Sequence, residues 1–174
     1  MLLHERVWGA ADGLKLWIQT AGTHLVQNQS HNGWTGGTHV DLVFLFALDG
    51  LIQCCAINAP GSMHISPLAD FGVCEKMSEM HKKCNAKVVV DSAFDMSGSP
   101  CSMESAQIDP IKTAAGLSLN GEATSLRQLL EWGMRMIQAQ FPQMKEPIAC
   151  EEMGERRLLN TSWFSSTTFR HQLF

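Results

Sequence analysis

The stretch "AKVVVDSAFDM", residues 86–96, decides the fold class of this 174-residue chain. Its strand-forming part, residues 87–90, is β-branched, too short for a helix and apolar on both faces. This pattern is typical of an interior strand in a sheet that is covered on both sides. Asp91 follows the strand directly. A charge in this position indicates either a cap of the next turn, helped by Ser92, or a ligand in a site at the edge of the sheet.

Three other strands are predicted before this one. Residues 40–48 (VDLVFLFAL) and 51–57 (LIQCCAI) are apolar runs joined by Asp49-Gly50. That dipeptide is the strongest short signal for a β-hairpin, so Asp49 is interpreted as turn chemistry alone. Residues 7–18 predict a first strand that is interrupted or ended by Asp12-Gly13.

The remaining segments complete an α/β pattern. In chain order they predict a Gly-, Asn- and His-rich loop over 19–39, a helix over 67–84, an irregular stretch over 95–124, and a helix over 125–141 that Ser125 caps and Pro142 stops. A three-stranded meander, a helical crossover to a fourth strand and a late helix predict a mixed sheet flanked by helices. A ribonuclease-H-like fold has this order, and other α/β folds accommodate it too.

Composition is consistent with one globular domain spanning residues 1–174. No apolar stretch approaches the roughly 20 residues that cross a bilayer, so we expect an intracellular protein without a membrane partner. The formal charge is −4, with no basic patch of the kind that grips nucleic acid. The six cysteines form no regular framework, which predicts reduced thiols. A zinc site at Cys74, His81 and Cys84 lacks a fourth ligand at a familiar spacing.

Three carboxylates stand where a metal site could form. Asp12 is expected at the end of the first strand, Asp91 at the end of the interior strand, and Glu131 at the edge of the buried stripe of the late helix. Close carboxylates repel one another unless a cation neutralises them, and Mg²⁺ or Mn²⁺ prefers such oxygen ligands. The alternative for Glu131 is an exposed ladder with Arg127 and Arg135, four residues away on either side.

Five motifs in order extend this interpretation to a family. They are "ADGLKL" (11–16), "NGWTGGTHVDLVFLFALDGLIQ" (32–53), "NAPGSMHIS" (58–66), "VVVDSAF" (88–94) and "SLRQLLEWGMRMIQAQFPQMK" (125–145). Together they resemble the DDE superfamily endonuclease domain of PIF/Harbinger-type transposases. The resemblance implies a ribonuclease-H-like fold and a nuclear enzyme that cleaves DNA phosphodiesters. It also implies a catalytic triad of Asp12, Asp91 and Glu131 that holds two Mg²⁺ or Mn²⁺ ions.

The resemblance also assigns neighbouring residues and leaves an alternative open. Arg127, Arg135 and His64 become candidates for contacting DNA phosphates. Ile65 stands where the family segment has Asp, and "TGGTH" replaces a His-Asp-His-like stretch. Such transposases carry a helix-turn-helix region ahead of the catalytic domain, so we expect an incomplete domain that uses a separate DNA-binding protein. The alternative is a transposase-derived protein that keeps the fold without the chemistry and serves as a binding or scaffold module.

Overall fold

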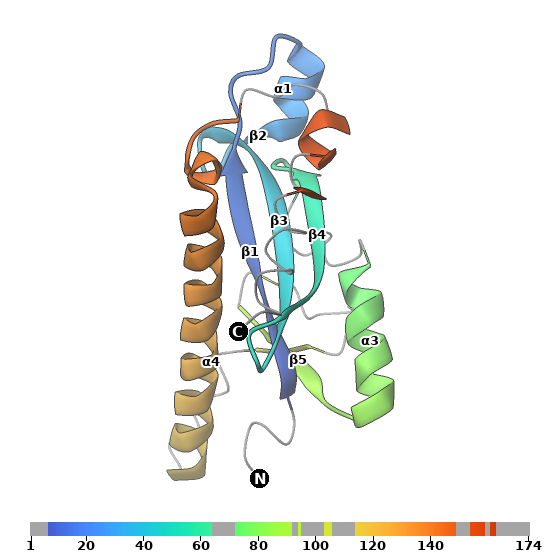
Figure 1. Ribbon diagram of the computed structural model, residues 1–174, viewed down its shortest axis with the longest axis vertical. Helices are drawn as coiled ribbons and strands as arrows, with labels where there is room; N and C mark the ends of the chain where they lie inside the picture. The colour runs from blue at the N-terminus through green and yellow to red at the C-terminus, as the bar shows by residue number, and fades with distance from the viewer. Residues whose placement is uncertain are drawn as a thin grey trace.

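The computed structural model describes residues 7–63, 72–91, 94, 103–105, 114–148, 154–158 and 161–162, with side chains described in all of these except 103–105, 114–120 and 123. These residues form a mixed sheet with helices on both faces (Figure 1). None of the described helices has the length and apolar character needed to cross a membrane.

The sheet is built from six strands within the described residues. They are β1 (Val7–Trp17), β2 (His31–Asn32), β3 (Gly37–Ala47), β4 (Ile52–Pro60), β5 (Lys87–Val90) and β6 (Met103–Ser105). The five longer strands lie in the order β4-β3-β1-β5-β6, and β2 pairs with the start of β3. β3 is antiparallel to both β1 and β4, whereas β5 is parallel to both β1 and β6. The predicted mixed α/β architecture is confirmed, and its topology is ribonuclease-H-like.

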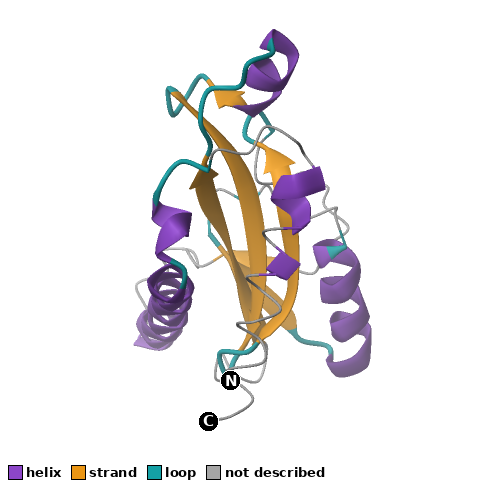
Figure 2. Ribbon diagram, turned by 45° about the horizontal axis from the view of Figure 1, so that its top comes forward, coloured by secondary structure: helices purple, strands orange, loops and turns teal. Residues whose placement is uncertain are grey.

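Helices flank this sheet on both faces and at the end where α1 lies (Figure 1). They are α1 (His24–Ser30), α3 (Val73–Cys84), α4 (Ala114–Gln140), the 3₁₀ turn η2 (Pro142–Lys145) and a short helical segment at 154–158. Figures 1 and 2 show α4 along one face and α3 against the other. The two sides therefore bury separate apolar clusters.

β3 supplies both clusters because successive side chains of a strand point to opposite faces. On the α4 side the buried residues are Val7, Ala10, Leu16, Ile18, Val40, Leu42, Phe44, Phe46, Val89, Leu126, Leu130, Met134, Ile137 and Met144. On the α3 side they are Ala11, Val43, Leu45, Ala56, Ala59, Val73, Met77, Val88, Val90 and Phe94. All three valines of β5 are buried, which confirms the interior strand predicted from "KVVV".

The predicted hairpin is confirmed, including the role of its turn residues. Gly50 has a positive φ of 82°, which glycine adopts without strain. The Asp49 carboxylate accepts a hydrogen bond from the Leu51 backbone N–H at 3.0 Å. Asp49 thus serves the turn between β3 and β4.

The first strand and the following loop differ from expectation. β1 runs through Asp12 and Gly13 without interruption, because β3 pairs with both residues, at Phe44 and Val43. The long partner strand overrides the turn propensity of Asp-Gly. The predicted loop over 19–39 contains α1, β2 and the start of β3.

The helices and cysteines also bring corrections. α4 begins eleven residues before Ser125, so this residue lies inside the helix, and its hydroxyl donates to the Gly121 carbonyl at 2.9 Å. β6 lies inside the stretch expected to be irregular. α3 begins at Val73, and residues 67–71 of the predicted helix lie outside the described residues. Reduced thiols are confirmed for Cys54, Cys55 and Cys84 and are wrong for Cys74, which is disulfide-bonded.

A buried polar pair lies on β3 beyond the α3-side cluster. His39 is 0% exposed and Asp41 is 2% exposed, and His39 Nε2 lies 3.5 Å from Asp41 Oδ1. Asp41 Oδ1 has no hydrogen-bond partner among the described residues. Burial raises the pKa of Asp41 to about 6 and lowers the pKa of His39, with the nearby Lys15 charge opposing the first shift and adding to the second. The fold therefore favours the neutral form of both side chains.

We predict that Asp41→Asn stabilises the protein at neutral pH, where burial of the charged Asp41 carboxylate destabilises the wild type. The folded-state pKa of Asp41 is raised, so its contribution to stability is present below the unfolded-state value near 3.8 and is lost as pH rises through about 6. An asparagine side chain does not titrate. The free energy of unfolding of the variant, relative to that of the wild type, should therefore increase by about 2–3 kcal/mol as pH rises from acidic to mildly alkaline. Urea unfolding across this pH range measures the difference, and a constant difference would contradict the prediction.

Candidate functional site

The pairing of β1 with β5 places two aspartates next to each other. These strands are parallel, with Ala10 opposite Val89 and Ala11 opposite Val90. Asp12 follows Ala11 in β1, and Asp91 follows Val90 at the end of β5. Asp12 was predicted to end β1, which is wrong, but β5 does end beside it. The carboxyl end of the short strand β5 therefore lies beside Asp12, at the kind of sheet edge where α/β proteins bind ligands.

The late helix contributes its charged edge to the same place. Asp12 alternates with Ala11, so it belongs to the face of β1 that α4 covers. From α4, Arg127 Nη2 lies 3.5 Å from Asp91 Oδ2, and Arg127 Nε lies 3.9 Å from Glu131 Oε1. Arg127 thus links a strand-end aspartate to a helical glutamate.

Burial and the neighbouring charges shift the pKa of Asp12. It is raised above the usual value, first by partial burial, while a hydrogen bond from the Gly13 backbone N–H at 2.8 Å opposes the rise. The charges of Asp91 and Glu131 raise the pKa further, and the charge of Arg127 lowers it. The other two carboxylates named from the sequence therefore both act electrostatically on Asp12.

The donor set suits a hard divalent cation, but the side chains are not arranged around one. Carboxylate oxygens are the ligands that Mg²⁺ and Mn²⁺ prefer, and like charges at Asp12 favour a neutralising cation. Within the described ranges, no group of three or more His, Cys, Asp or Glu side chains is arranged to hold a metal ion. Here the positive charge between Asp91 and Glu131 is the guanidinium of Arg127.

The other candidates lie apart from this cluster. Arg135 is exposed, and in the described part of the chain it forms no ion pair, so the expected Arg-Glu-Arg ladder consists of Arg127 and Glu131 alone. His64 and Ile65 lie outside the described residues. Cys74, His81 and Cys84 do not form a metal group, and Cys74 is disulfide-bonded.

Sequence reasoning missed two features of the site. The contact between Arg127 and Asp91 joins residues 36 positions apart, which no helical periodicity reveals. The inward polar pair His39 and Asp41 on β3 was also missed. Both residues alternate with the apolar residues Val40 and Leu42, but His39 fell in the predicted loop over 19–39 and only Asp41 in the predicted strand over 40–48. This alternation of polar and apolar residues was the sequence signal that could have identified the pair.

Comparison with known proteins identifies one family. The family model described as DDE superfamily endonuclease matches residues 11–159. No curated protein and no solved structure matches the chain.

We predict opposite effects of two α4 substitutions on Asp12. Glu131→Gln removes a negative charge and should lower the pKa of Asp12, whereas Arg127→Gln removes a positive charge and should raise it. NMR titration of the Asp12 carboxyl carbon, with a chelator present, measures both shifts. Arg135→Gln, one turn further along α4, is the matched control and should leave the Asp12 titration unchanged. Shifts of the same sign for Glu131→Gln and Arg127→Gln would show that the three charges do not act on Asp12 as described.

Proposed function

The chain belongs to the DDE superfamily endonuclease family, and we propose that it is a divalent-metal-dependent DNA endonuclease of the transposase type. Asp12, Asp91 and Glu131 are the proposed catalytic carboxylates. The observation that carries this proposal is the β1–β5 register, which sets Asp12 beside the end of β5, where Asp91 and Glu131 share Arg127 and both raise the pKa of Asp12. The five ordered motifs support the PIF/Harbinger type as its finer assignment.

The proposed ligands are these three carboxylates, and the proposed cofactor is Mg²⁺ or Mn²⁺ as a pair of ions. When bound, such ions activate the attacking water or hydroxyl and stabilise the leaving oxygen of a phosphodiester. Asp12 has the most to gain from a cation, because partial burial and two neighbouring carboxylates all disfavour its charged form.

Arg127 has two proposed roles in this site. Its guanidinium balances Asp91 and Glu131 while no other cation is near them. When a cation neutralises the carboxylates, Arg127 is released to contact a DNA phosphate, which its planar fork of donors suits. Arg135, exposed one turn beyond Glu131, and His64 are proposed as further phosphate contacts.

A second candidate function is a binding module that kept the fold without the chemistry. The observation that favours it is the present arrangement of the cluster, in which Arg127 lies where charge neutralisation is needed and no described group is set to hold a metal. In this version Arg127 is a permanent partner of the carboxylates, and the surface acts through binding alone.

We predict that the purified protein nicks supercoiled DNA in the presence of Mn²⁺. Asp91→Asn and Glu131→Gln should each reduce nicking by at least about 10²-fold, the scale expected for loss of a catalytic group. Glu79→Gln is the matched control, because Glu79 is an exposed carboxylate on α3, on the opposite face of the sheet. Gel electrophoresis of the plasmid measures the rate. Nicking that survives both site substitutions would refute the catalytic assignment.

Calorimetry with Mn²⁺ separates the two candidate functions. The enzyme should bind the ion at millimolar concentration or tighter, and Asp12→Ala should abolish this binding. Arg127→Gln should leave binding intact or strengthen it, since the guanidinium competes with the ion for Asp91 and Glu131. Absence of Mn²⁺ binding in the folded wild-type protein would favour the binding module.

A further inference from the structure

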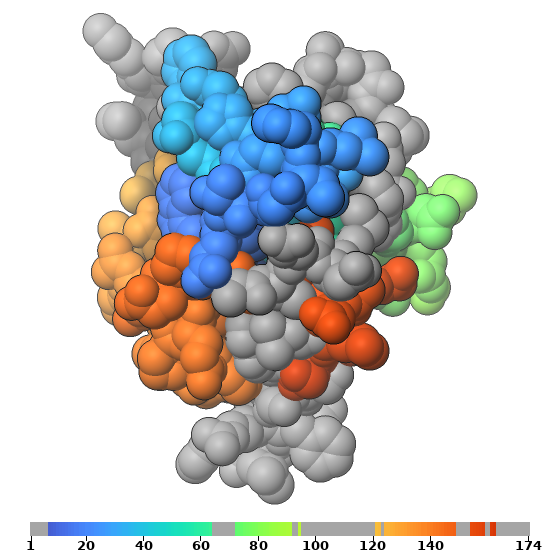
Figure 3. Space-filling view, turned by 90° about the horizontal axis from the view of Figure 1, so that it is seen from above, coloured from blue at the N-terminus to red at the C-terminus, as the bar shows by residue number. Residues whose placement is uncertain are grey.

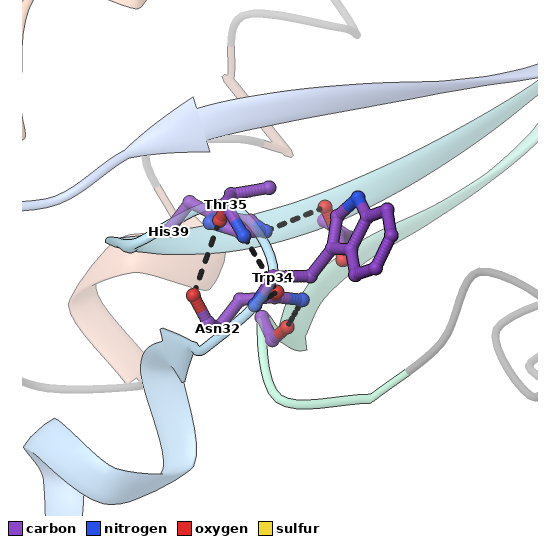
Figure 4. Close-up of polar contacts among 6 residues, drawn as sticks. Asn32, Trp34, Thr35 and His39 are labelled. Carbon is purple, nitrogen blue, oxygen red and sulfur yellow. Dashed lines mark hydrogen bonds and ion pairs between the residues drawn. The ribbon is translucent and has the colours of Figure 1, made fainter.

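Trp34 is the most exposed of the large apolar side chains whose exposure the structure describes. It lies in the turn between β2 and β3 and is 97% exposed. Indole rings bury a large apolar area and usually find a partner for both the ring and the N–H group. In Figure 4 the indole points away from the hydrogen bonds of its own turn, so the free molecule presents both ring faces to solvent.

The turn that carries Trp34 is fixed by its neighbour Asn32. The Asn32 side-chain oxygen accepts hydrogen bonds from the backbone N–H groups of Trp34 at 2.9 Å and Thr35 at 3.2 Å (Figure 4). Its side-chain amide donates to the Gly61 carbonyl at 2.6 Å, which ties the turn to the chain just after β4. The backbone of Trp34 is therefore ordered before any partner arrives, which lowers the entropy cost of binding.

The residues beside Trp34 are small, and the space around them is open. Gly33 precedes Trp34, and Gly36 lies two residues after it. A side-chain carbon built on either glycine would meet no atom within 4 Å. The ring therefore projects from a narrow turn with space beside it, in contrast to Trp132, which lines an apolar groove with Leu129 and Met136 on α4. A lone, accessible ring suits a flat partner better than a broad apolar surface.

The segment that carries Trp34 contains no acidic side chain that would repel an anion. Residues 13–40 contain no Asp or Glu, although the chain holds 17 acidic residues. Lys15, His24 and His31 in this segment are exposed, and Asp41, the first acidic residue after it, is buried. Figure 3 looks onto the end of the molecule where α1 and the neighbouring blue segments form the surface. A polyanion can approach this segment although the net charge of the chain is −4.

We propose that Trp34 stacks on an unpaired base of the DNA substrate, a partner that rests on the proposed endonuclease function. Base–aromatic stacking tolerates any base, because every base has a flat π-face, and it favours single-stranded or locally opened DNA. The turn positions the ring, and the acid-free segment admits the sugar–phosphate backbone beside it.

Binding of a fluorescein-labelled oligothymidylate, followed by anisotropy at low salt with EDTA present, tests this proposal. Trp34→Ala should weaken binding about tenfold, and Trp34→Phe should retain most of the affinity because a ring remains. Trp132→Ala is the matched control, since Trp132 is also exposed, at 62%, and lies on α4 away from this turn. It should bind like the wild type. Thermal melting should be the same for wild type and Trp34→Ala, because the indole is almost entirely in solvent.

Three outcomes would overturn the stacking site: no binding of oligothymidylate by the wild type, unchanged affinity in Trp34→Ala, or an equal loss in Trp132→Ala. Unchanged affinity in Trp34→Ala is also the result expected if the ring docks on a protein instead. The assay contains no divalent ion, so its result does not depend on metal binding or catalysis at the carboxylate cluster. If the protein nicks DNA and Trp34→Ala binds oligothymidylate like the wild type, the stacking site alone is refuted. If binding depends on Trp34 and the protein does not nick DNA, the catalytic proposal alone is refuted.

Discussion

The parallel register of β1 and β5 is the constraint on which the candidate site depends. Pairing of Ala11 with Val90 makes Asp12 and Asp91 neighbours, whatever the connecting segments do. Both strands are buried between α3 and α4, so their register is strongly specified. A slip of one residue would turn Asp12 to the α3 face, away from Glu131 and Arg127. The two apolar clusters of the sheet thus hold the acidic cluster in place.

A register that gathers carboxylates has an electrostatic cost, and a cation must offset it. In the structure this cation is Arg127, at 3.5 Å from Asp91 and 3.9 Å from Glu131. These distances are long for ion pairs, and the side chains of Arg127 and Glu131 are nearly half exposed, so the contacts are weak. A weakly held guanidinium is easily displaced by a divalent ion, whose attraction to the same oxygens is stronger. On the proposed function, the Arg127 ion pairs and the metal-bound form are therefore two states of one cluster.

Locally encoded elements were predictable, and elements set by distant partners were not. Asp49-Gly50 encodes its own turn, and three adjacent valines encode a buried strand, so the hairpin and β5 followed from the sequence. The continuity of β1 through Asp12-Gly13 depends on β3, which is distant in the sequence. β6 has the polar sequence Met-Glu-Ser and exists as a strand through its pairing with β5. For the site, residue types indicated the carboxylates, whereas the Arg127–Asp91 contact required the folded chain.

β1 joins one member of the acidic cluster, Asp12, to the start of the acid-free segment, which relates the two proposed DNA contacts. Asp12 lies within β1, and Trp17 at its end pairs with His39, close to the turn that carries Trp34. The five residue steps from Asp12 to Trp17 span roughly 17 Å, about half a helical turn of duplex DNA, and the turn that carries Trp34 lies beyond Trp17. Carboxylates repel a phosphate backbone unless cations intervene. On the two proposals, DNA therefore contacts the segment around Trp34 first, and it contacts the carboxylates only once they hold a cation.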